Sequence, residues 1–254
     1  GGRAVIYQDI HRAAFLSRPN RFIAQVELDG AVETVHVKNT GRCRELLVPG
    51  CTVYLERCPN PARKTKFDLI AVEKARPGLP PLLINLDAQA PNQVFGEWLA
   101  SGRGAELGLP KPDLLRPETT WGNSRFDFYW ELSETDAPGP PREPERTLPR
   151  RGFVEVKGCT LEENGLALFP DAPTERGVKH LRELAACRRA GYEAAVCFVL
   201  QMAGMRSFSP NDATHPAFGA ALRAAAEAGV SVLAVECTVA ADRLTMAKPV
   251  PVLL

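Results

Sequence analysis

The segment Phe153-Val154-Glu155-Val156-Lys157-Gly158 carries the pattern from which the fold can be worked out. Side chains alternate between the two faces of an extended strand, so Glu155 and Lys157 point to one face. Val154 and Val156 point to the other face, and the alternation predicts a strand that buries one side. A carboxylate and an ammonium group therefore leave the sheet side by side.

A second alternating segment precedes this strand, at Arg125-Phe126-Asp127-Phe128-Tyr129-Trp130. Alternation places Phe126, Phe128 and Trp130 on one face and Asp127 on the opposite face. If the two strands pair, Asp127 and Glu155 can share one divalent cation. The connection between them, residues 133–151, contains five prolines and four arginines, and we expect an irregular, mobile loop there.

Two carboxylates and a lysine suit the hydrolysis of a phosphodiester. Carboxylate oxygens hold Mg²⁺ or Mn²⁺, and the metal polarises the phosphate and lowers the pKa of a bound water. Lys157 would position that water or offset developing charge. The order of Asp127, Glu155 and Lys157 is that of the PD-(D/E)XK nucleases, and either Glu97 or Glu118 is a candidate third ligand. The alternative interpretation is an exposed charge pair on an amphipathic strand.

Short β-rich segments lie upstream, between residue 22 and about residue 84. Asp29-Gly30 between two alternating runs is a strong hairpin signal, and further strands are expected at 51–56, 68–73 and 82–86. Five or so short strands predict a small β-barrel of the oligonucleotide-binding (OB) kind. Residues 1–86 contain 13 Lys and Arg against 8 Asp and Glu, whereas the remainder contains 18 against 22. The basic first part is therefore the natural place for a polyanion to bind.

Helical and strand patterns alternate after residue 86. We expect helices at 92–100, 174–189 and 213–228, with strands at 194–200 and 230–235. A hairpin is expected to turn at Asn164-Gly165. This order is typical of an α/β layer. The predicted fold is mixed α/β, with an OB-like β-barrel at 1–86 and an α/β domain at 87–254.

The predicted helix at 174–189 brings polar groups near the Glu-x-Lys strand. If the helix begins at Thr174, then Arg176, His180 and Glu183 share one face. That face can hold a phosphate or orient a ligand carboxylate. The alternative is that His180 and Asp171 only satisfy backbone groups near the helix start. We treat Asp171, Thr174, Arg176 and His180 as candidates for support of the site.

Basic side chains of the barrel are candidates for contacts with backbone phosphates, which bind without reading sequence. They are Arg18, Arg21, Lys38, Arg42, Arg44, Arg63, Lys64 and Lys66. Any one of them is explained as a solvated surface charge, whereas the set within a basic domain indicates nucleic-acid binding.

Other features of the 254-residue chain exclude several classes of protein. No apolar run is long enough for a membrane helix, and neither a Walker A motif nor a G-x-G-x-x-G motif indicates a nucleotide cofactor. Seven cysteines without metal-ligand spacing predict reduced thiols. The start lacks an apolar leader, so we expect the protein in the cytoplasm.

Characteristic short motifs occur in order along nearly the whole chain. They are Asn20-Arg21-Phe22, His36-Val37-Lys38-Asn39-Thr40-Gly41, Glu45-Leu46, Ser124-Arg125-Phe126-Asp127-Phe128, Val154-Glu155-Val156-Lys157-Gly158, Phe169-Pro170-Asp171-Ala172-Pro173-Thr174-Glu175-Arg176-Gly177, Lys179-His180-Leu181-Arg182-Glu183-Leu184, and Arg206 with Phe208-Ser209-Pro210. Together they resemble the sugar fermentation stimulation protein A (SfsA) family. The resemblance implies an OB-like domain, a PD-(D/E)XK nuclease-like domain, sequence-nonspecific DNA binding and a regulatory role in maltose metabolism.

Three functions follow from these observations. The first is a sequence-nonspecific DNA-binding protein that keeps an acidic site for Mg²⁺ or Mn²⁺, formed by Asp127 and Glu155. The second is an active metal-dependent nuclease that cleaves DNA or RNA. The third is a protein-interaction module that binds neither metal nor DNA.

Overall fold

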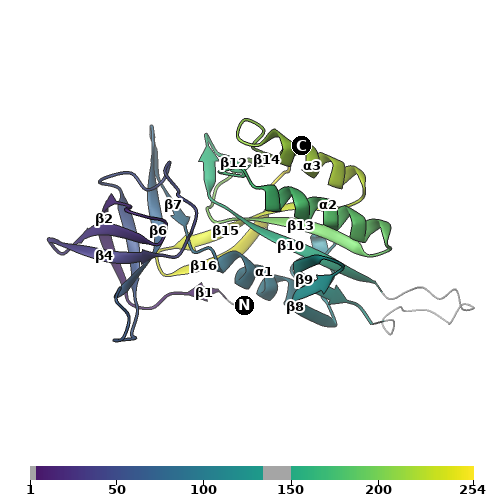
Figure 1. The fold of residues 1–254 in the computed structure, drawn as a ribbon, viewed down its shortest axis with the longest axis horizontal. Helices are drawn as coiled ribbons and strands as arrows, with labels where there is room; N and C mark the ends of the chain where they lie inside the picture. The colour runs from purple at the N-terminus through teal and green to yellow at the C-terminus, as the bar shows by residue number, and fades with distance from the viewer. Residues whose placement is uncertain (1–3, 134–149) are drawn as a thin grey trace, which may run out of the picture.

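The computed structural model describes residues 4–133 and 150–254, and Figure 1 shows a β-barrel beside a larger α/β domain. The Pro-rich stretch for which a mobile loop is predicted lies almost entirely outside these described residues. No helix within the described residues has both the length and the apolar character needed to cross a lipid bilayer. All seven cysteines are unpaired, as predicted.

Five strands form the barrel, and a sixth extends it. They are β2 (Ile10–Ser17), β3 (Ile23–Leu28), β4 (Ala31–Val37), β5 (Thr52–Arg57), β6 (Phe67–Arg76) and the extending strand β7 (Leu79–Asn85). A short parallel pairing of His36 and Val37 in β4 with β6 closes the barrel. Asp29 and Gly30 both have positive φ, as a tight hairpin turn requires, so the predicted hairpin is confirmed.

The second domain is built on a mixed seven-stranded sheet in the order β1-β16-β15-β13-β10-β9-β8. Its strands are β1 (Val5–Ile6), β8 (Leu114–Trp121), β9 (Ser124–Glu131), β10 (Arg151–Cys159), β13 (Glu193–Leu200), β15 (Ser231–Ala240) and β16 (Arg243–Pro249). The three inner strands β10, β13 and β15 run parallel, and the outer strands are antiparallel. The predicted division at residue 86 falls between β7 and α1, but β1 pairs with β16 and so belongs to this second sheet.

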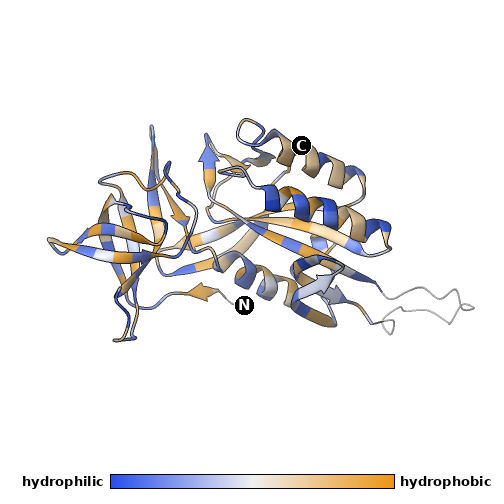
Figure 2. Ribbon diagram, in the orientation of Figure 1, coloured by the Kyte–Doolittle hydropathy of each residue, from blue (hydrophilic) through white to orange (hydrophobic). Residues whose placement is uncertain are grey.

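Helices cover both faces of the sheet (Figure 1). On one face lies α1 (Ala90–Ala100), and on the other lie α2 (Glu175–Arg189) and α3 (Pro216–Glu227). Figure 2 shows polar residues on the outer side of α2 and apolar residues along the strands below it. Burial of these apolar faces forms the core of the domain.

A small three-stranded sheet adjoins the ends of the inner strands. It contains β11 (Leu161–Glu163), β12 (Leu166–Phe169) and β14 (Ser207–Pro210), and a short 3-10 helix, η1 (Ala105–Leu107), follows α1. The β11–β12 hairpin turns at Asn164 and Gly165, both with positive φ, as predicted. The predicted fold, an OB-like barrel with a mixed α/β domain, is therefore confirmed.

Buried polar contacts join the barrel to the α/β domain. The carboxylate of Glu162 lies 2.9 Å from Nζ of Lys74 in β6. Elsewhere the hydroxyl of Tyr7 donates to Asp87 at 2.9 Å, and the amide of Gln201, which follows β13, donates to Asn85 at 2.9 Å. Buried polar groups stay stable only when such partners are present, so these contacts fix the two parts against each other.

Candidate functional site

Asp127 lies where the strands β9 and β10 separate. Their pairing ends at Val154 and Phe128. Just beyond this point, Oδ2 of Asp127 accepts a hydrogen bond of 2.7 Å from the backbone N–H of Val156, and Oδ1 accepts one of 3.0 Å from Asn92 in α1. The side chain therefore takes the place of a missing ladder bond, which fixes its carboxylate beside β10.

The side-chain alternation of β9 breaks at the same residue. The ring of Phe126 packs against Phe153 on the α2 side of the sheet, whereas Phe128 packs against Phe95 of α1 on the other side. The expectation that Phe126 and Phe128 share a face is therefore wrong. Glu118, which lies across from Asp127 in the register of β8, has a positive φ of 48°, so the distortion extends into the neighbouring strand.

Glu155 and Lys157 meet a histidine from α2. Oε1 of Glu155 lies 2.9 Å from Nδ1 of His180 and 3.4 Å from Nζ of Lys157. Glu155 is only 4% exposed. Helix α2 begins as predicted at Thr174, whose hydroxyl accepts a hydrogen bond of 3.0 Å from the N–H of Gly177. This cap sets the helix so that His180 faces β10.

Nδ1 of His180 also lies 3.1 Å from Nζ of Lys157. A ring nitrogen carries either a proton or a lone pair, so Nδ1 donates to Glu155 or accepts from Lys157 but does not do both. The hydrogen bonding among the three groups therefore depends on the tautomer of His180.

The pKa values of the two carboxyl groups are shifted in opposite directions. Burial, and then the charge of Glu155, raise the pKa of Asp127 to about 6. Burial opposes ionisation of Glu155 as well, but the hydrogen bond from His180 and the charge of Lys157 outweigh it and lower the pKa. Adjacent acids whose pKa values are driven apart are typical of functional sites.

The donor set fits a hard divalent cation. Oε2 of Glu155 is buried and has no hydrogen-bond partner within the described residues, and each oxygen of Asp127 has accepting capacity beyond its one hydrogen bond. The described residues contain no cluster of three or more His, Cys, Asp or Glu at ligand distances. Mg²⁺ is usually held by one or two protein carboxylates and fills its remaining positions with water or phosphate oxygens, so the residues that could hold it here are Asp127 and Glu155.

The other predicted site residues lie at several places. Oε2 of Glu97 in α1 is buried without a described partner, whereas Glu118 forms an exposed ion pair of 2.8 Å with Arg125. Asp171 lines a cavity of about 190 Å³ between the two domains, and Arg176 is exposed at the start of α2. The structure thus brings Asp127, Glu155, Lys157 and His180 together. In the described part of the chain, Asp171 and Arg176 form no hydrogen bond with any of these four residues.

The predicted phosphate-binding residues divide into two groups. Arg18 donates to backbone carbonyls of Arg21 and Arg42 at 2.7 Å, and Arg63 donates to Asp68 at 2.8 Å, so their guanidinium groups are already used. Lys38 is half-buried, 3.8 Å from Asp87. The exposed members, free to meet a phosphate, are Arg21, Arg42, Arg44, Lys64 and Lys66.

Two site residues have no sequence signal of their own. Asn92 holds Asp127, and Gln201 packs over Gly158, where an added Cβ would lie 2.6 Å from Oε1 of Gln201 and 2.8 Å from Cγ of Pro91. Asn92 follows Pro91 in the first turn of α1, and Gln201 directly follows the inner strand β13. Only the packing of α1 and β13 around β10 identifies them.

Comparison with known proteins identifies several relatives. The family model described as the sugar fermentation stimulation protein RE domain matches residues 89–243, and that of the SfsA N-terminal OB domain matches residues 16–78. A sugar fermentation stimulation protein homolog of Desulfitobacterium hafniense (strain Y51) is 52% identical over 238 residues, 94% of this chain and 93% of that protein. The homolog of Clostridium beijerinckii is 47% identical over 248 residues, 98% of this chain and 99% of its own.

A solved structure shares the fold. The structure of Pyrococcus furiosus SfsA in complex with Ca²⁺ matches with a TM-score of 0.79, over 99% of this chain and 100% of that chain. At 24% sequence identity, the match concerns the architecture of both domains.

Proposed function

The chain belongs to the sugar fermentation stimulation protein (SfsA) family, and within that family we propose that it is a sequence-nonspecific DNA-binding protein whose α/β domain holds Mg²⁺ or Mn²⁺. The observation that carries the proposal is that Asp127 is held by the N–H of Val156, the residue next to the buried Glu155. Oε2 of Glu155 has no hydrogen-bond partner within the described residues, and Lys157 lies 3.4 Å from its other oxygen. A cation placed there would neutralise two carboxylates that repel each other. The Pyrococcus furiosus relative was solved with Ca²⁺, which prefers the same oxygen ligands.

The basic barrel supplies the DNA-binding half of the proposal. Its exposed arginines and lysines contact phosphates without reading bases, while the acidic site accepts DNA only when a cation screens its charge. A bound cation would polarise a phosphate and lower the pKa of a water molecule. Lys157 lies close enough to Glu155 to offset negative charge that develops on a phosphate at the site.

The proposal also includes a cytoplasmic location and a regulatory role in maltose or sugar metabolism. The regulatory role is supported by the family's name alone. DNA binding in the cytoplasm is the activity through which such regulation would act.

Fluorescence anisotropy with unrelated duplexes of equal length tests DNA binding. We expect equal affinities for the different sequences and a steep fall in affinity as salt rises, because binding releases counterions. Calorimetry with Mn²⁺ tests the cation site in the wild type, in Asp127→Ala and Glu155→Ala, and in the control Asp29→Ala on the exposed hairpin turn. Affinity that ignores salt, or Mn²⁺ binding that survives in both site variants, would refute the proposal.

Metal-dependent hydrolysis of DNA or RNA is the second candidate function. The retained Lys157 and the opposite pKa shifts of Asp127 and Glu155 favour it, because a surface kept only for binding does not need that arrangement. Single-stranded, duplex, flapped and branched substrates should be incubated with Mn²⁺ and the wild type or Lys157→Met. Cleavage that requires Lys157 would establish a nuclease, and metal binding without cleavage would leave the DNA-binding protein. A wild type that binds neither metal nor DNA would instead be an interaction module.

A further inference from the structure

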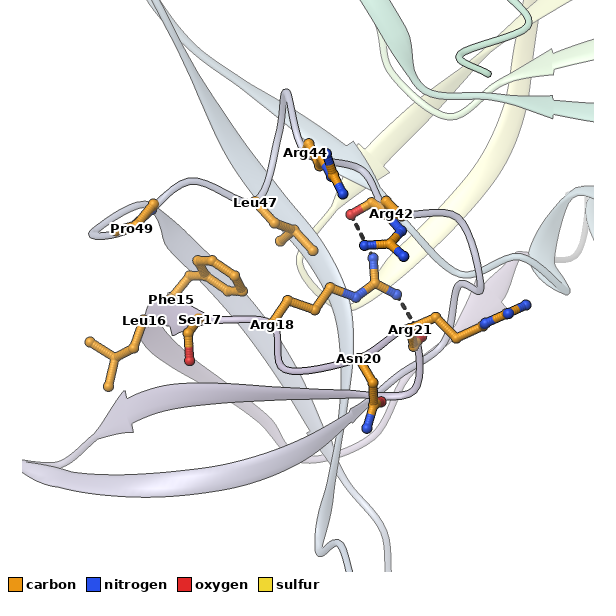
Figure 3. Close-up of a pocket in the computed structure, with 10 residues that line it drawn as sticks. All are labelled: Phe15, Leu16, Ser17, Arg18, Asn20, Arg21, Arg42, Arg44, Leu47 and Pro49. Atoms are coloured by element: carbon orange, nitrogen blue, oxygen red, sulfur yellow. Dashed lines mark hydrogen bonds between the residues drawn. The ribbon is translucent and has the colours of Figure 1, made fainter. Parts of the chain in front are cut away.

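Two loops of the barrel are held together by one partly buried guanidinium. Arg18 donates to the carbonyls of Arg21 and Arg42 at 2.7 Å each (Figure 3). It also donates to the carbonyl of Asn39 at 2.5 Å and to that of Gly41. These carbonyls belong to residues 18–22 and 38–44. Arg18 is therefore a positioning residue, which holds both loops in one arrangement before any ligand arrives.

The fastened loops present an aromatic side chain to solvent. Phe22 is 55% exposed, and the guanidinium of Arg21 lies 5.8 Å from the centre of its ring. The ring cannot sink into the barrel, because the carbonyl of Phe22 accepts a bond of 2.8 Å from Val37 and its N–H donates to Asn20 at 2.8 Å. An exposed ring on a fixed backbone beside cations is the usual platform on which nucleobases stack.

Two adjoining hollows extend from this ring to the strand β10. Phe22 lines a hollow of about 280 Å³ together with Lys38 and Gln89. A second hollow of about 190 Å³ shares Asn39 and Ala88 with the first and continues to Pro91 and Gly158. Gly158 belongs to β10, so the second hollow extends from the barrel surface to the strand that carries Glu155 and Lys157.

We propose that these two hollows bind single-stranded DNA, with an unpaired base stacked on Phe22 and the DNA strand running between the domains towards β10. A duplex hides the faces of its bases, so only an unpaired strand can use the ring of Phe22. Arg21, which lies beside the ring, is exposed and can meet a phosphate of the bound strand. The inference rests on the proposed DNA binding and names the form of DNA that the site takes.

The ring also differs from a surface for docking another protein. The large exposed apolar side chains of the described residues are scattered, at Ile6, Phe22, Val32, Val48, Leu79, Leu253 and Leu254. Phe22 lies beside Arg21, and polar side chains such as Asn39 and Gln89 line the hollow next to it. Charge and shape therefore favour a polyanion with flat, stackable groups over an apolar partner.

Fluorescence anisotropy with labelled oligothymidine and with a duplex of equal length tests this inference. We expect Phe22→Ala to lower the affinity for the single strand roughly tenfold or more, as the loss of one stacked base does, and to leave duplex affinity unchanged. Phe22→Trp should keep the single-strand affinity, and its indole fluorescence should be quenched on binding. Leu79→Ala, which truncates another exposed apolar side chain of the barrel, is the matched control and should behave as the wild type.

The outcomes separate the inference from the function on which it rests. If the wild type binds duplex DNA in a salt-dependent way but Phe22→Ala leaves single-strand affinity unchanged, the proposed function stands and the stacking platform is refuted. An equal loss for both DNA forms also refutes it, because the ring then acts as general surface. If the wild type binds no DNA of either form, both proposals fail.

Discussion

Replacing Asp127 by asparagine should make the metal-free protein more stable at neutral pH. Burial and the charge of Glu155 raise the pKa of Asp127 from 3.8 to about 6. The unfolded chain releases this proton more readily than the folded chain, so ionisation destabilises the fold as pH rises from 3.8 to about 6, and the full cost remains at higher pH. This rise in pKa lowers the free energy of unfolding by roughly 3 kcal/mol once Asp127 is ionised.

The asparagine amide retains part of what the carboxylate does. Its oxygen can still accept from the N–H of Val156, and the side chain of Asn92 can rotate to accept from the new NH₂ group. We subtract about 1 kcal/mol for the weaker, uncharged hydrogen bonds. The net gain of about 2 kcal/mol should raise the melting temperature by roughly 4 to 8 °C for a chain of this size.

Thermal unfolding in the presence of EDTA measures this difference. Wild type, Asp127→Asn and the control Asp29→Asn, an exposed turn residue, should be melted between about pH 4 and about pH 8. Asp127→Asn should be the most stable at the upper end and should lose its advantage at the lower end. Added Mn²⁺ should stabilise the wild type and the control but not Asp127→Asn.

The reasoning fails on either of two results. If Asp127→Asn is less stable than the wild type near pH 8 without metal, burial and the charge of Glu155 do not disfavour the ionised form of Asp127 as we infer. If the difference between them does not change with pH, it comes from packing and not from the charge on Asp127.

Three further substitutions test the other contacts. Glu155→Gln should destabilise the metal-free protein by about 1 to 3 kcal/mol near neutral pH, because the lowered pKa of Glu155 means that its ionised form stabilises the fold. This stabilisation should disappear as the pH falls through the pKa of Glu155 in the folded protein. Urea unfolding at two pH values measures the difference. Lys157→Met should keep the affinity for Mn²⁺ within about twofold of the wild type but remove any cleavage of DNA or RNA. Calorimetry measures the first and a gel assay the second. Loss of Mn²⁺ binding would instead show that Lys157 is needed for the structure of the site. Arg18→Ala should destabilise the barrel by about 2 to 4 kcal/mol, because several backbone carbonyls lose their hydrogen-bond donor. Arg18→Lys should not restore the stability, because one ammonium group cannot reach all of these carbonyls. Equal stability of Arg18→Lys and the wild type in thermal melts would contradict this explanation.

Local signals in the sequence predicted the elements that depend on few neighbours. The turns at Asp29-Gly30 and Asn164-Gly165 were found because they require residues that tolerate positive φ, and both have it. Strand β13 was found because every residue after Glu193 is apolar and buried. Strand β2, although central to the barrel, was missed because His11 and Arg12 interrupt its alternation, and β8 and β16 were missed because their partners are set by the sheet.

The candidate site divides in the same way. Alternation placed Glu155 and Lys157 on one face, and helical spacing from Thr174 brought His180 towards them. Asn92 could not be predicted, because its role depends on how α1 packs beside the gap between β9 and β10. Arg18 was predicted to contact phosphate because the sequence cannot show the carbonyls that enclose its guanidinium.

The pairing of β1 with β16 makes the barrel an insertion within the α/β domain in the topological sense. Residues 5–6 begin the larger sheet, the chain leaves to build the barrel, and it returns at α1. At the outer edge of that sheet Val5 pairs with Leu244, which lies near the other end of the chain in sequence. The hydroxyl of Tyr7 donates a hydrogen bond to Asp87, where the chain returns from the barrel. The larger domain therefore reaches its complete edge only when the barrel connects its two parts, and we expect the two domains to unfold in one cooperative transition rather than in two separate ones.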